Sequence, residues 1–236
     1  MLNKKELEKY NRQLILPEVG NEGQLKIKSL KVLVVGAGGL GCPVLQYLVA
    51  AGVGKIGIAD GDIINMSNLQ RQILYSEQEI GMKKASVAYD KLQRMNPDTV
   101  FEVYDVFLTR DNAGEIVKGY DVIVGATDNF ESRYLIDQLS QSYNIPFVHG
   151  SVEGFQGQYT VFNYRGGVSY SDVFPEKKEE AEGEVIGVVG AMPGIIGSFM
   201  AMEVIKVACN PENVAFDGLY LYHALENKLS KLGYGV

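Results

Sequence analysis

The stretch VLVVGAGGLG, residues 32–41, decides the fold that we expect for this chain. An apolar run that ends in G-x-G-x-x-G is typical of a buried parallel strand that turns directly into a helix. Gly36 permits the tight turn, Gly38 lets a phosphate approach the backbone, and Gly41 lets the helix pack closely on the sheet. The first N–H groups of such a helix are free to bind an anion. The stretch therefore predicts a nucleotide site, and by itself it fits NAD as well as ATP.

Apolar runs and helical patterns alternate along the first 150 residues, which predicts βαβ units and a parallel sheet. The expected strands are residues 31–35, 55–59, 99–106, 120–126 and 146–150. One expected helix begins after residue 39, and three others cover residues 83–95, 111–117 and 130–143. Beyond residue 150, residues 154–164 and 219–232 favour antiparallel strands. We predict an α/β, Rossmann-like, doubly wound sheet that is mainly parallel and is continued by antiparallel strands in the C-terminal part.

Length and composition indicate one soluble domain. The chain has 236 residues, of which 46% are hydrophobic and 22% charged, enough to bury a sizeable core. Its net charge of -7 disfavours a nucleic-acid binder, which grips phosphate with clustered lysine and arginine. The expected parts of the domain are an N-terminal helical arm (1–30), a nucleotide-binding half (31–150) and a C-terminal part (151–236) with a mobile loop (175–184) and a helix (193–208).

Residues 185–202 form an apolar run without a charged side chain, and the segment that precedes this run is mainly acidic. Pro193 and several glycines interrupt the run, so we expect a buried helix rather than a membrane span. The two cysteines, Cys42 and Cys209, have no paired spacing, and the first residues do not resemble an apolar signal peptide. We therefore expect a cytoplasmic location.

Polar and basic residues follow the second predicted strand. Asp60 ends that strand and is placed to accept hydrogen bonds from ribose hydroxyl groups. The residues that come soon after are Asn68, Arg71, Lys83 and Lys84. Two lysines at the start of a helix oppose its dipole, and such a broken local rule indicates function, because these cations can neutralise a triphosphate. The alternative is a solvated lysine pair and a surface arginine.

Asp128 follows the predicted strand at residues 120–126. The carboxyl ends of parallel strands share one edge of the sheet, so Asp128 is expected near Asp60. A carboxylate beside phosphate groups is a natural ligand for Mg²⁺. The alternative is that Thr127 or Asp128 caps the helix that begins near residue 130, and the two roles do not exclude each other.

Several segments occur in the order found in one known family. They are YNRQLILPEVG, GAGGLG, GVGKIGIADGD, NLQRQ, GMKKA, ATDNFESR and PGIIGSFMAMEVIK. In this ordered set the chain resembles the ThiF/MoeB family, the bacterial relatives of ubiquitin-activating enzymes, from about residue 10 to residue 209. Members of that family are homodimers that use MgATP to adenylate the C-terminal glycine carboxylate of a ubiquitin-like sulfur-carrier protein. The resemblance implies the same activity here, with a ThiS-like or MoaD-like carrier as partner.

The resemblance also implies roles for individual residues. The nucleotide-binding residues that it implies are Gly36, Gly38, Gly39, Gly41, Asp60, Asp62, Asn68, Gln70, Arg71, Lys84, Asp128 and Asn129. The catalytic residues that it implies are Arg71, Lys84, Asp128, which would bind Mg²⁺, and Arg12, which would reach the ATP of the partner subunit. A glycine carboxylate is already an anion at pH 7, so adenylation needs no general base. We therefore expect His149 and His223 to be structural.

The chain departs from the family at its cysteines. Many members hold zinc with two Cys-x-x-Cys pairs, but here SYSD at residues 169–172 replaces the first and the second has no counterpart. We predict no zinc site. Many members also use a cysteine in the loop that here includes residues 175–184, where none occurs. Cys42 and Cys209 are expected to be buried small residues, so we expect the reaction to stop at the acyl-adenylate.

The carrier is inferred from one short segment. FPEKKEE, residues 174–180, resembles a stretch of thiamine-pathway members, which favours thiazole biosynthesis over the alternative carrier, the small subunit of molybdopterin synthase. Two alternatives of a different class are an NAD-dependent oxidoreductase and a non-catalytic, dimeric module that senses ATP. Pyrophosphate exchange that depends on an added carrier would separate these hypotheses.

Overall fold

The structure is a computed structural model that describes residues 1–175 and 187–234. Its helices are α1 (Lys4–Lys9), α2 (Asn11–Leu14), α3 (Gly20–Ser29), α4 (Gly41–Ala51), α5 (Lys84–Met95), α6 (Arg110–Val117), α7 (Phe130–Tyr143), α8 (Tyr170–Val173) and α9 (Ala191–Cys209), with the short helices η1 (Met66–Asn68), η2 (Glu77–Glu79) and η3 (Pro211–Asn213). Its strands are β1 (Lys31–Val35), β2 (Lys55–Ala59), β3 (Val100–Tyr104), β4 (Val122–Gly125), β5 (Phe147–Glu153), β6 (Gln156–Phe162), β7 (Gly218–His223) and β8 (Lys228–Gly233). The loop predicted at residues 175–184 lies outside the described residues, except for Pro175.

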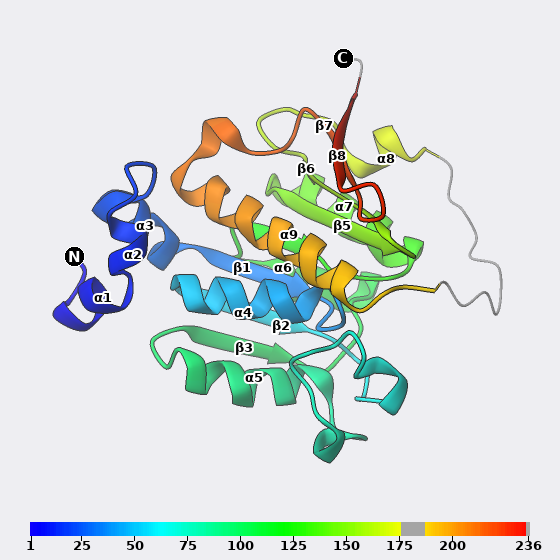
Figure 1. Cartoon of the computed structure of the whole chain (residues 1–236), viewed down its shortest axis with the longest axis horizontal. Coiled ribbons are helices and arrows are strands. Elements are labelled where there is room, and N and C mark those ends of the chain that lie inside the picture. The colour runs from blue at the N-terminus through cyan, green and yellow to red at the C-terminus, as the bar shows by residue number, and fades with distance from the viewer. Residues whose placement is uncertain (176–186, 235–236) are drawn as a thin grey trace.

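The described part of the chain forms an eight-stranded sheet in the order β3-β2-β1-β4-β5-β6-β7-β8 (Figure 1). The strands from β3 to β5 in this order are parallel, and β6, β7 and β8 join them in antiparallel pairs. This arrangement confirms the predicted sheet, including the antiparallel continuation. β5 runs three residues beyond its predicted end, because its last residues pair with β6 in a hairpin.

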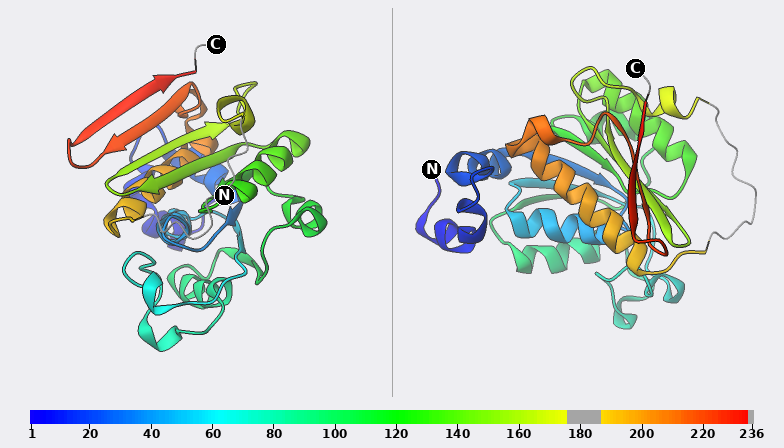
Figure 2. Two further views of the ribbon diagram at one scale, coloured as in Figure 1. Left: turned by 90° about the vertical axis from the view of Figure 1, so that its right-hand side faces the viewer. Right: turned by 45° about the horizontal axis from the view of Figure 1, so that its top comes forward.

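Helices cover both faces of the sheet, and alternate side chains of each strand enter two cores. Val32 and Val34 of β1 belong to the core beneath α4, α5 and α9, and Leu33 and Val35 belong to the core beneath α6, α7 and α8. The two helical layers are visible from the side in Figure 2. A sheet buried on both faces explains why the parallel strands read as continuous apolar runs.

The apolar segment predicted as a buried helix forms α9. By length and composition this helix could cross a membrane. In the structure it packs against α4, β5 and β6, with Met192, Ile196 and Met200 fully buried. Its two ends extend one or two residues beyond the prediction. The helix therefore contributes to the core that holds the glycine-rich turn in place.

The strand order reverses at β1, because β2 lies on one side of it and β4 on the other. Val35, the last residue of β1, is in register with Ala59 of β2 and Gly125 of β4. Sheets of this kind bind ligands at such a switch point, beyond the carboxyl ends of the strands. The arm of α1, α2 and α3 lies at the opposite end of the molecule, beside the amino ends of the strands (Figure 2).

Candidate active site

The glycine-rich turn, residues 36–41, connects β1 to α4 at the switch point. Gly36 has a φ of 98°, and a Cβ there would lie 2.5 Å from the carbonyl oxygen of Ala126. A Cβ on Gly41 would lie 2.0 Å from the carbonyl oxygen of Gly36. The backbone itself therefore requires both glycines. Within the described residues no side chain caps α4. The N–H of Cys42 donates to the carbonyl of Gly38 (2.9 Å) and Pro43 has no N–H, so the backbone N–H groups that remain for an anion are those of the turn itself, at Gly39, Leu40 and Gly41.

The two middle glycines of the turn have a different environment. A Cβ on Gly38 would lie 3.4 Å from the side-chain nitrogen of Gln72, and one on Gly39 would lie 3.5 Å from Cγ of Arg71 and 3.2 Å from Pro193. These neighbours are side chains rather than backbone. The segment that contains Arg71 therefore lies directly over the turn, as a phosphate-binding role requires.

Asp60 joins the turn to the end of β2. Its carboxylate is 8% exposed and accepts hydrogen bonds from the backbone N–H of Ala37 (2.7 Å) and of Asp62 (2.8 Å). Burial raises the pKa of Asp60, and the two backbone hydrogen bonds oppose that shift. The carboxylate lies next to the glycine turn, at the position expected for a ribose ligand.

Lys84 pairs with the segment that follows β2. Its Nζ lies 2.8 Å from Oδ2 of Asp62, and only 5% of its side chain is exposed. Lys83 is exposed, occupies the N-cap position of α5, and donates from Nζ to the carbonyl of Gly61 (2.8 Å). The alternative of a solvated lysine pair is therefore wrong for Lys84, because a buried cation beside the turn is retained at a cost of desolvation.

Two further residues of this region were not predicted as site residues, although Gln72 belongs to the NLQRQ segment. The hydroxyl of Tyr75, which is 7% exposed, lies 2.8 Å from the carbonyl oxygen of Ala37 and 3.2 Å from that of Lys84. Gln72 is buried, and its Oε1 has no hydrogen-bond partner among residues 1–175 and 187–234. Tyr75 reaches the turn across 38 residues of sequence, and no local pattern marks such a contact.

The loop around η1 carries the remaining predicted phosphate contacts. Asn68 accepts a hydrogen bond at Oδ1 from the N-cap backbone of η1 (3.3 Å), and Arg71 donates from Nη1 to the carbonyl of Ser67 (3.1 Å). Gln70 is exposed, and its carbonyl oxygen would lie 2.0 Å from a Cβ on Gly190. The segment that leads into α9 therefore passes directly against this loop.

Asp128 lies beyond the end of β4, on the other side of the switch point. Its side chain is exposed and makes no hydrogen bond or ion pair with the residues that the structure describes. Asn129 is the residue that caps α7, because its Oδ1 accepts from the backbone N–H of Ser132 (2.8 Å). The cap alternative for Thr127 or Asp128 is therefore wrong, and Asn129 uses its single side-chain oxygen for the cap.

Arg12 does not lie with the other predicted site residues. It is an exposed residue of α2, and its neighbour Gln13 donates a hydrogen bond to the carbonyl of Ala51 (3.2 Å), at the C-terminal end of α4. The glycine turn is at the N-terminal end of that helix. Eleven residues of α-helix span about 16 Å, so Arg12 belongs to the end of the molecule opposite its own turn.

Of the cysteines and histidines that the structure describes, only Cys42 contacts the turn, because its Sγ donates to the carbonyl of Ala37 (3.5 Å). Cys42 is fully buried and burial raises its pKa to about 12, whereas Cys209 is only partly buried, contrary to our expectation, and burial also raises its pKa. His149 is fully buried, and burial lowers its pKa well below the usual value, which favours the neutral ring. His223 is partly buried. Neither thiol is suited to form a reactive thiolate.

Comparison with known proteins settles the family. The model of the ThiF family matches residues 10–233. This chain belongs to the ThiF family. It is 45% identical to a sulfur carrier protein adenylyltransferase of Thermus thermophilus, over 97% of this chain and 88% of that protein. It is 38% identical to a probable molybdopterin-synthase adenylyltransferase of Gracilaria tenuistipitata, over 98% of this chain and 65% of that protein. The chain is therefore an ATP-using adenylyltransferase.

Solved structures support the fold at lower sequence identity. The chain is 20% identical to Escherichia coli MccB bound to MccA-N7isoASN, with a TM-score of 0.87 over 99% of this chain and 73% of that one. Escherichia coli MccB bound to ATP is 19% identical, with a TM-score of 0.82 over 100% of this chain and 80% of that one. These similarities confirm the architecture around the glycine turn and carry no information on the substrate.

Proposed function

We propose that this adenylyltransferase transfers AMP from MgATP to the C-terminal glycine carboxylate of a ubiquitin-like sulfur-carrier protein, in the thiazole branch of thiamine biosynthesis in the cytoplasm. The observation that carries the proposal is the arrangement at the switch point, where an uncapped helix N-terminus, buried Lys84 and exposed Asp128 flank one turn. Its support from similarity is a relative at 45% identity whose name states that it adenylates a sulfur carrier.

The residues of the site divide the nucleotide between them in this proposal. Asp60 and the backbone at Gly38 and Gly39 would hold the adenosine, because they lie at the end of β2 and at the turn. Arg71 and Lys84 would bind phosphate oxygens, together with Asn68. A triphosphate carries more negative charge than the two phosphates of NAD, and cations held beside the turn favour it for that reason.

Asp128 is suited to hold the magnesium ion. A magnesium ligand should offer carboxylate oxygen in an open position beside the phosphates, and it should not be committed to another partner. Asp128 meets these conditions, since it is exposed beyond the end of β4 and has no partner among the described residues. When bound there, Mg²⁺ would reduce the charge on the phosphate oxygens and favour the departure of pyrophosphate.

The reaction fits a site without a general base. A carboxylate oxygen of the carrier forms a bond to the α-phosphorus, the bond from that phosphorus to the bridging oxygen breaks, and pyrophosphate leaves with the electron pair. No proton has to move, so the chain needs only to position the two anions and to reduce their repulsion. His149 neither positions the two anions nor reduces their repulsion, because its ring is buried and neutral.

We further propose that the enzyme works as a symmetric homodimer. An open groove of about 730 Å³ runs between α4 and α9, with Tyr47, Ile73 and Phe199 among its lining. Tyr47 and Ile73 are 56% and 62% exposed, as apolar side chains at an interface are before a partner covers them. The occupant that fits is a second copy, because Arg12 lies too far from its own turn and can serve only the site of a partner.

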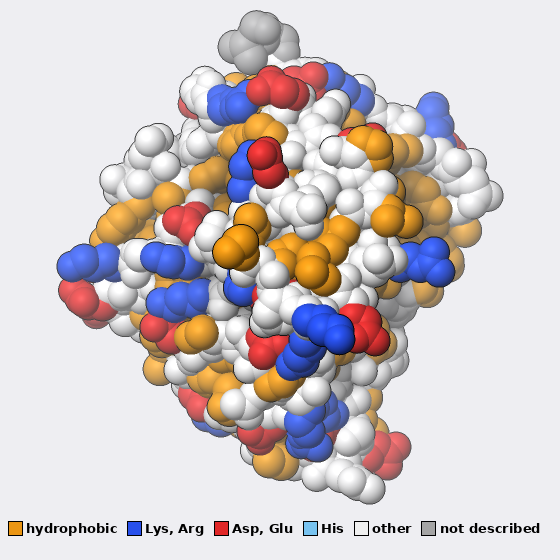
Figure 3. Space-filling view, turned by 90° about the vertical axis from the view of Figure 1, so that its left-hand side faces the viewer, with side chains coloured by type: hydrophobic (Ala, Val, Ile, Leu, Met, Phe, Trp, Pro, Cys, Tyr) orange, Lys and Arg blue, Asp and Glu red, His pale blue; other side chains and the backbone are white. Residues whose placement is uncertain are grey.

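The arm itself has the same character. Figure 3 shows the face that carries the arm, where hydrophobic side chains gather between lysine and arginine side chains. Ile15 and Leu16, directly after α2, are 63% and 48% exposed. A helix that extends Arg12 into a neighbouring subunit would bury these side chains against it.

A carrier-dependent pyrophosphate exchange assay tests the proposed reaction. Purified protein, MgATP and labelled pyrophosphate are combined with a ThiS-like carrier, a MoaD-like carrier or neither. We expect exchange with the ThiS-like carrier, and Asp128→Ala should lower it about 10³-fold, because loss of a metal ligand removes several kcal/mol of transition-state stabilisation. Asp121→Ala, which removes an exposed carboxylate at the other end of β4, is the control. Preference for the MoaD-like carrier would replace the thiamine assignment with the molybdopterin alternative.

Mixed dimers test the contribution of the partner. Arg12→Ala and Asp128→Ala subunits are unfolded together, refolded and assayed. In a mixed dimer, the site with intact Asp128 receives Arg12 from the other subunit, so random pairing should restore about a quarter of the wild-type rate. No recovery, with both parent variants inactive and the mixture shown to be dimeric, would mean that Arg12 does not act across the interface.

A further inference from the structure

Tyr10 connects the two short helices at the start of the arm. It ends α1 and begins α2, since its backbone N–H donates to the carbonyl of Glu6 (2.9 Å) and its own carbonyl accepts from the N–H of Gln13 (2.8 Å). Its ring is 5% exposed and lies against Gly52, where a Cβ would come within 2.5 Å of Cζ. Gly52 has a φ of 90° and ends α4. The start of α2 is thus seated on the C-terminal end of α4.

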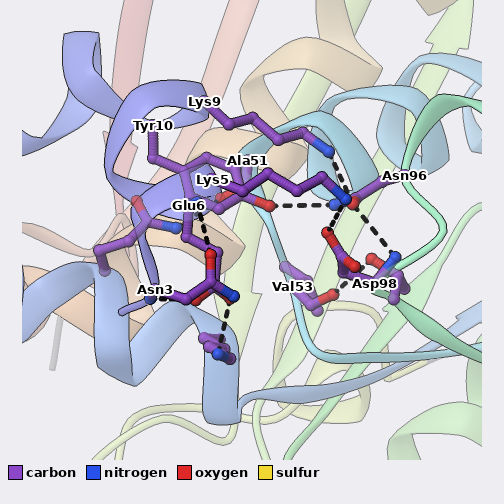
Figure 4. Close-up of polar contacts among 12 residues, drawn as sticks. Asn3, Lys5, Glu6, Lys9, Tyr10, Ala51, Val53, Asn96 and Asp98 are labelled. Carbon is purple, nitrogen blue, oxygen red and sulfur yellow. Dashed lines mark hydrogen bonds and ion pairs between the residues drawn. The ribbon is translucent and has the colours of Figure 1, made fainter. Parts of the chain in front are cut away.

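Asn96 holds the other side of Tyr10 (Figure 4). This residue is 1% exposed and follows α5. Its side-chain nitrogen donates to the hydroxyl of Tyr10 (3.1 Å) and to the carbonyl of Val49 in α4 (2.9 Å), and its Oδ1 accepts from Nζ of Lys9 (2.7 Å). One buried amide therefore links the arm, α4 and the end of α5.

The buried hydrogen bond between Tyr10 and Asn96 holds the arm to the turn after α5 more strongly than the exposed ion pair nearby. Lys5 and Asp98 also form an ion pair at 2.9 Å, but their side chains are 62% and 44% exposed. Exposed ion pairs contribute about 0–1 kcal/mol. A hydrogen bond between buried neutral groups is costly to leave unmade, because the released donor stays out of water.

Arg12 stands between anchored residues but is not anchored itself. Tyr10 and Gln13, on either side of it, both contact the C-terminal end of α4. Arg12 is exposed and makes no hydrogen bond or ion pair within residues 1–175 and 187–234. The backbone of α2 is therefore fixed while its one arginine projects outward.

We propose that Tyr10 and Asn96 are positioning residues for adenylation, which hold α2 so that Arg12 enters the partner's site in a productive orientation. This inference rests on the proposed role of Arg12 across the dimer. A misplacement of about 1 Å in a catalytic group can lower a rate by up to about 10²-fold. Loss of the Tyr10–Asn96 hydrogen bond loosens α2 at the point from which Arg12 extends, so its effect should pass through Arg12.

A double-mutant cycle on the dimeric enzyme tests this coupling. Tyr10→Phe keeps the ring against Gly52 and removes only the hydroxyl. We expect kcat for carrier-dependent pyrophosphate exchange to fall about tenfold, with KM for ATP changed less than about twofold. Arg12→Ala should lower kcat about 10²-fold, and the double variant should match Arg12→Ala within about twofold.

The control is Tyr164→Phe, which removes another buried tyrosine hydroxyl, one that donates to the carbonyl of Pro211 (3.2 Å) and takes no part in the contact between Tyr10 and Asn96. It should lower Tm about as much as Tyr10→Phe and leave kcat unchanged. A tenfold loss from Tyr10→Phe that persists in the Arg12→Ala background, or a loss of Tm with kcat unchanged, would overturn the positioning role. Full activity of Arg12→Ala would instead overturn the proposed action of Arg12, on which the inference depends.

Discussion

Asp137→Ala should destabilise the protein severely, by about 4 kcal/mol. Asp137 lies on α7, is 1% exposed, and accepts hydrogen bonds from the backbone N–H of Tyr170 (2.9 Å) and of Ser171 (3.2 Å), at the start of α8. It also accepts from the hydroxyl of Ser171 (2.8 Å), from Asn163 (2.9 Å) and from Gln141 (2.9 Å). These contacts hold residues 169–172, the segment that replaces the first Cys-x-x-Cys of the family.

The magnitude follows from the donors that would lose their acceptor. A buried N–H group left without a partner costs about 1–3 kcal/mol, and a hydrogen bond to a charged group contributes about 1.5–3 kcal/mol. The two backbone donors therefore bracket the loss at about 2–6 kcal/mol. Asn163 and Gln141 keep some access to water, since neither is fully buried, and they add less. For a chain of this length, 1 kcal/mol shifts Tm by about 2–4 °C, so the expected decrease is about 8–16 °C.

Thermal and urea unfolding, followed by circular dichroism, would measure the effect. Asp121→Ala is the matched control, because Asp121 is exposed and accepts from one backbone N–H, that of Lys31 (2.9 Å). It should cost less than about 1 kcal/mol. If Asp137→Ala costs no more than Asp121→Ala, the reasoning that this network holds α8 in place is refuted.

Three further predictions concern the thiols, pH and zinc. Cys42→Ser combined with Cys209→Ser should keep pyrophosphate exchange within a few-fold of wild type, and a thiol-sensitive carrier conjugate that the substitutions remove would contradict this. Lys55, 2.8 Å from Glu102, lowers the pKa of Glu102 to about 2 from the usual 4.5. The stability difference between wild type and Glu102→Gln should be complete above pH 4.5 and shrink as pH falls toward 2. Elemental analysis should find far less than one zinc ion per chain, since residues 169–172 contain no cysteine.

The fold was predictable because the decisive signals are local. The strands β1 and β2 and the helix α7 have the predicted bounds, since each is a clear apolar run or helical pattern that ends at glycine, aspartate or asparagine. β5 was predicted too short, because Ser151, Val152 and Glu153 become strand only through pairing with β6. Tertiary pairing of this kind leaves no periodic pattern in the strand itself.

The candidate site was predictable in part. The neighbours of the turn were found because motif residues at the carboxyl ends of strands must share one edge. The alternative that Thr127 or Asp128 caps α7 was wrong, because Thr127, Asp128 and Asn129 all have side chains suited to an N-cap, and only the first helical turn decides between them. Tyr75 was missed because its contact with the turn joins segments far apart in sequence, and Gln72 was passed over although it belongs to the NLQRQ segment.

The position of the arm constrains the geometry of the proposed dimer. One helix, α4, carries the glycine turn at its N-terminal end and the seat of the arm at its C-terminal end, and Tyr47 of the groove lies near its middle. A two-fold axis along α4 would place each arm beside the other arm, and Arg12 would find no nucleotide. A two-fold axis that lies in the interface and crosses α4 at right angles reverses the helix, so that each arm meets the partner's turn. The proposed role of Arg12 and the groove therefore agree only if the two α4 helices run antiparallel across the interface. Tyr47→Cys tests this arrangement, because a disulfide between the two introduced cysteines should form readily and preserve activity. Formation of that disulfide with loss of activity would exclude the antiparallel arrangement.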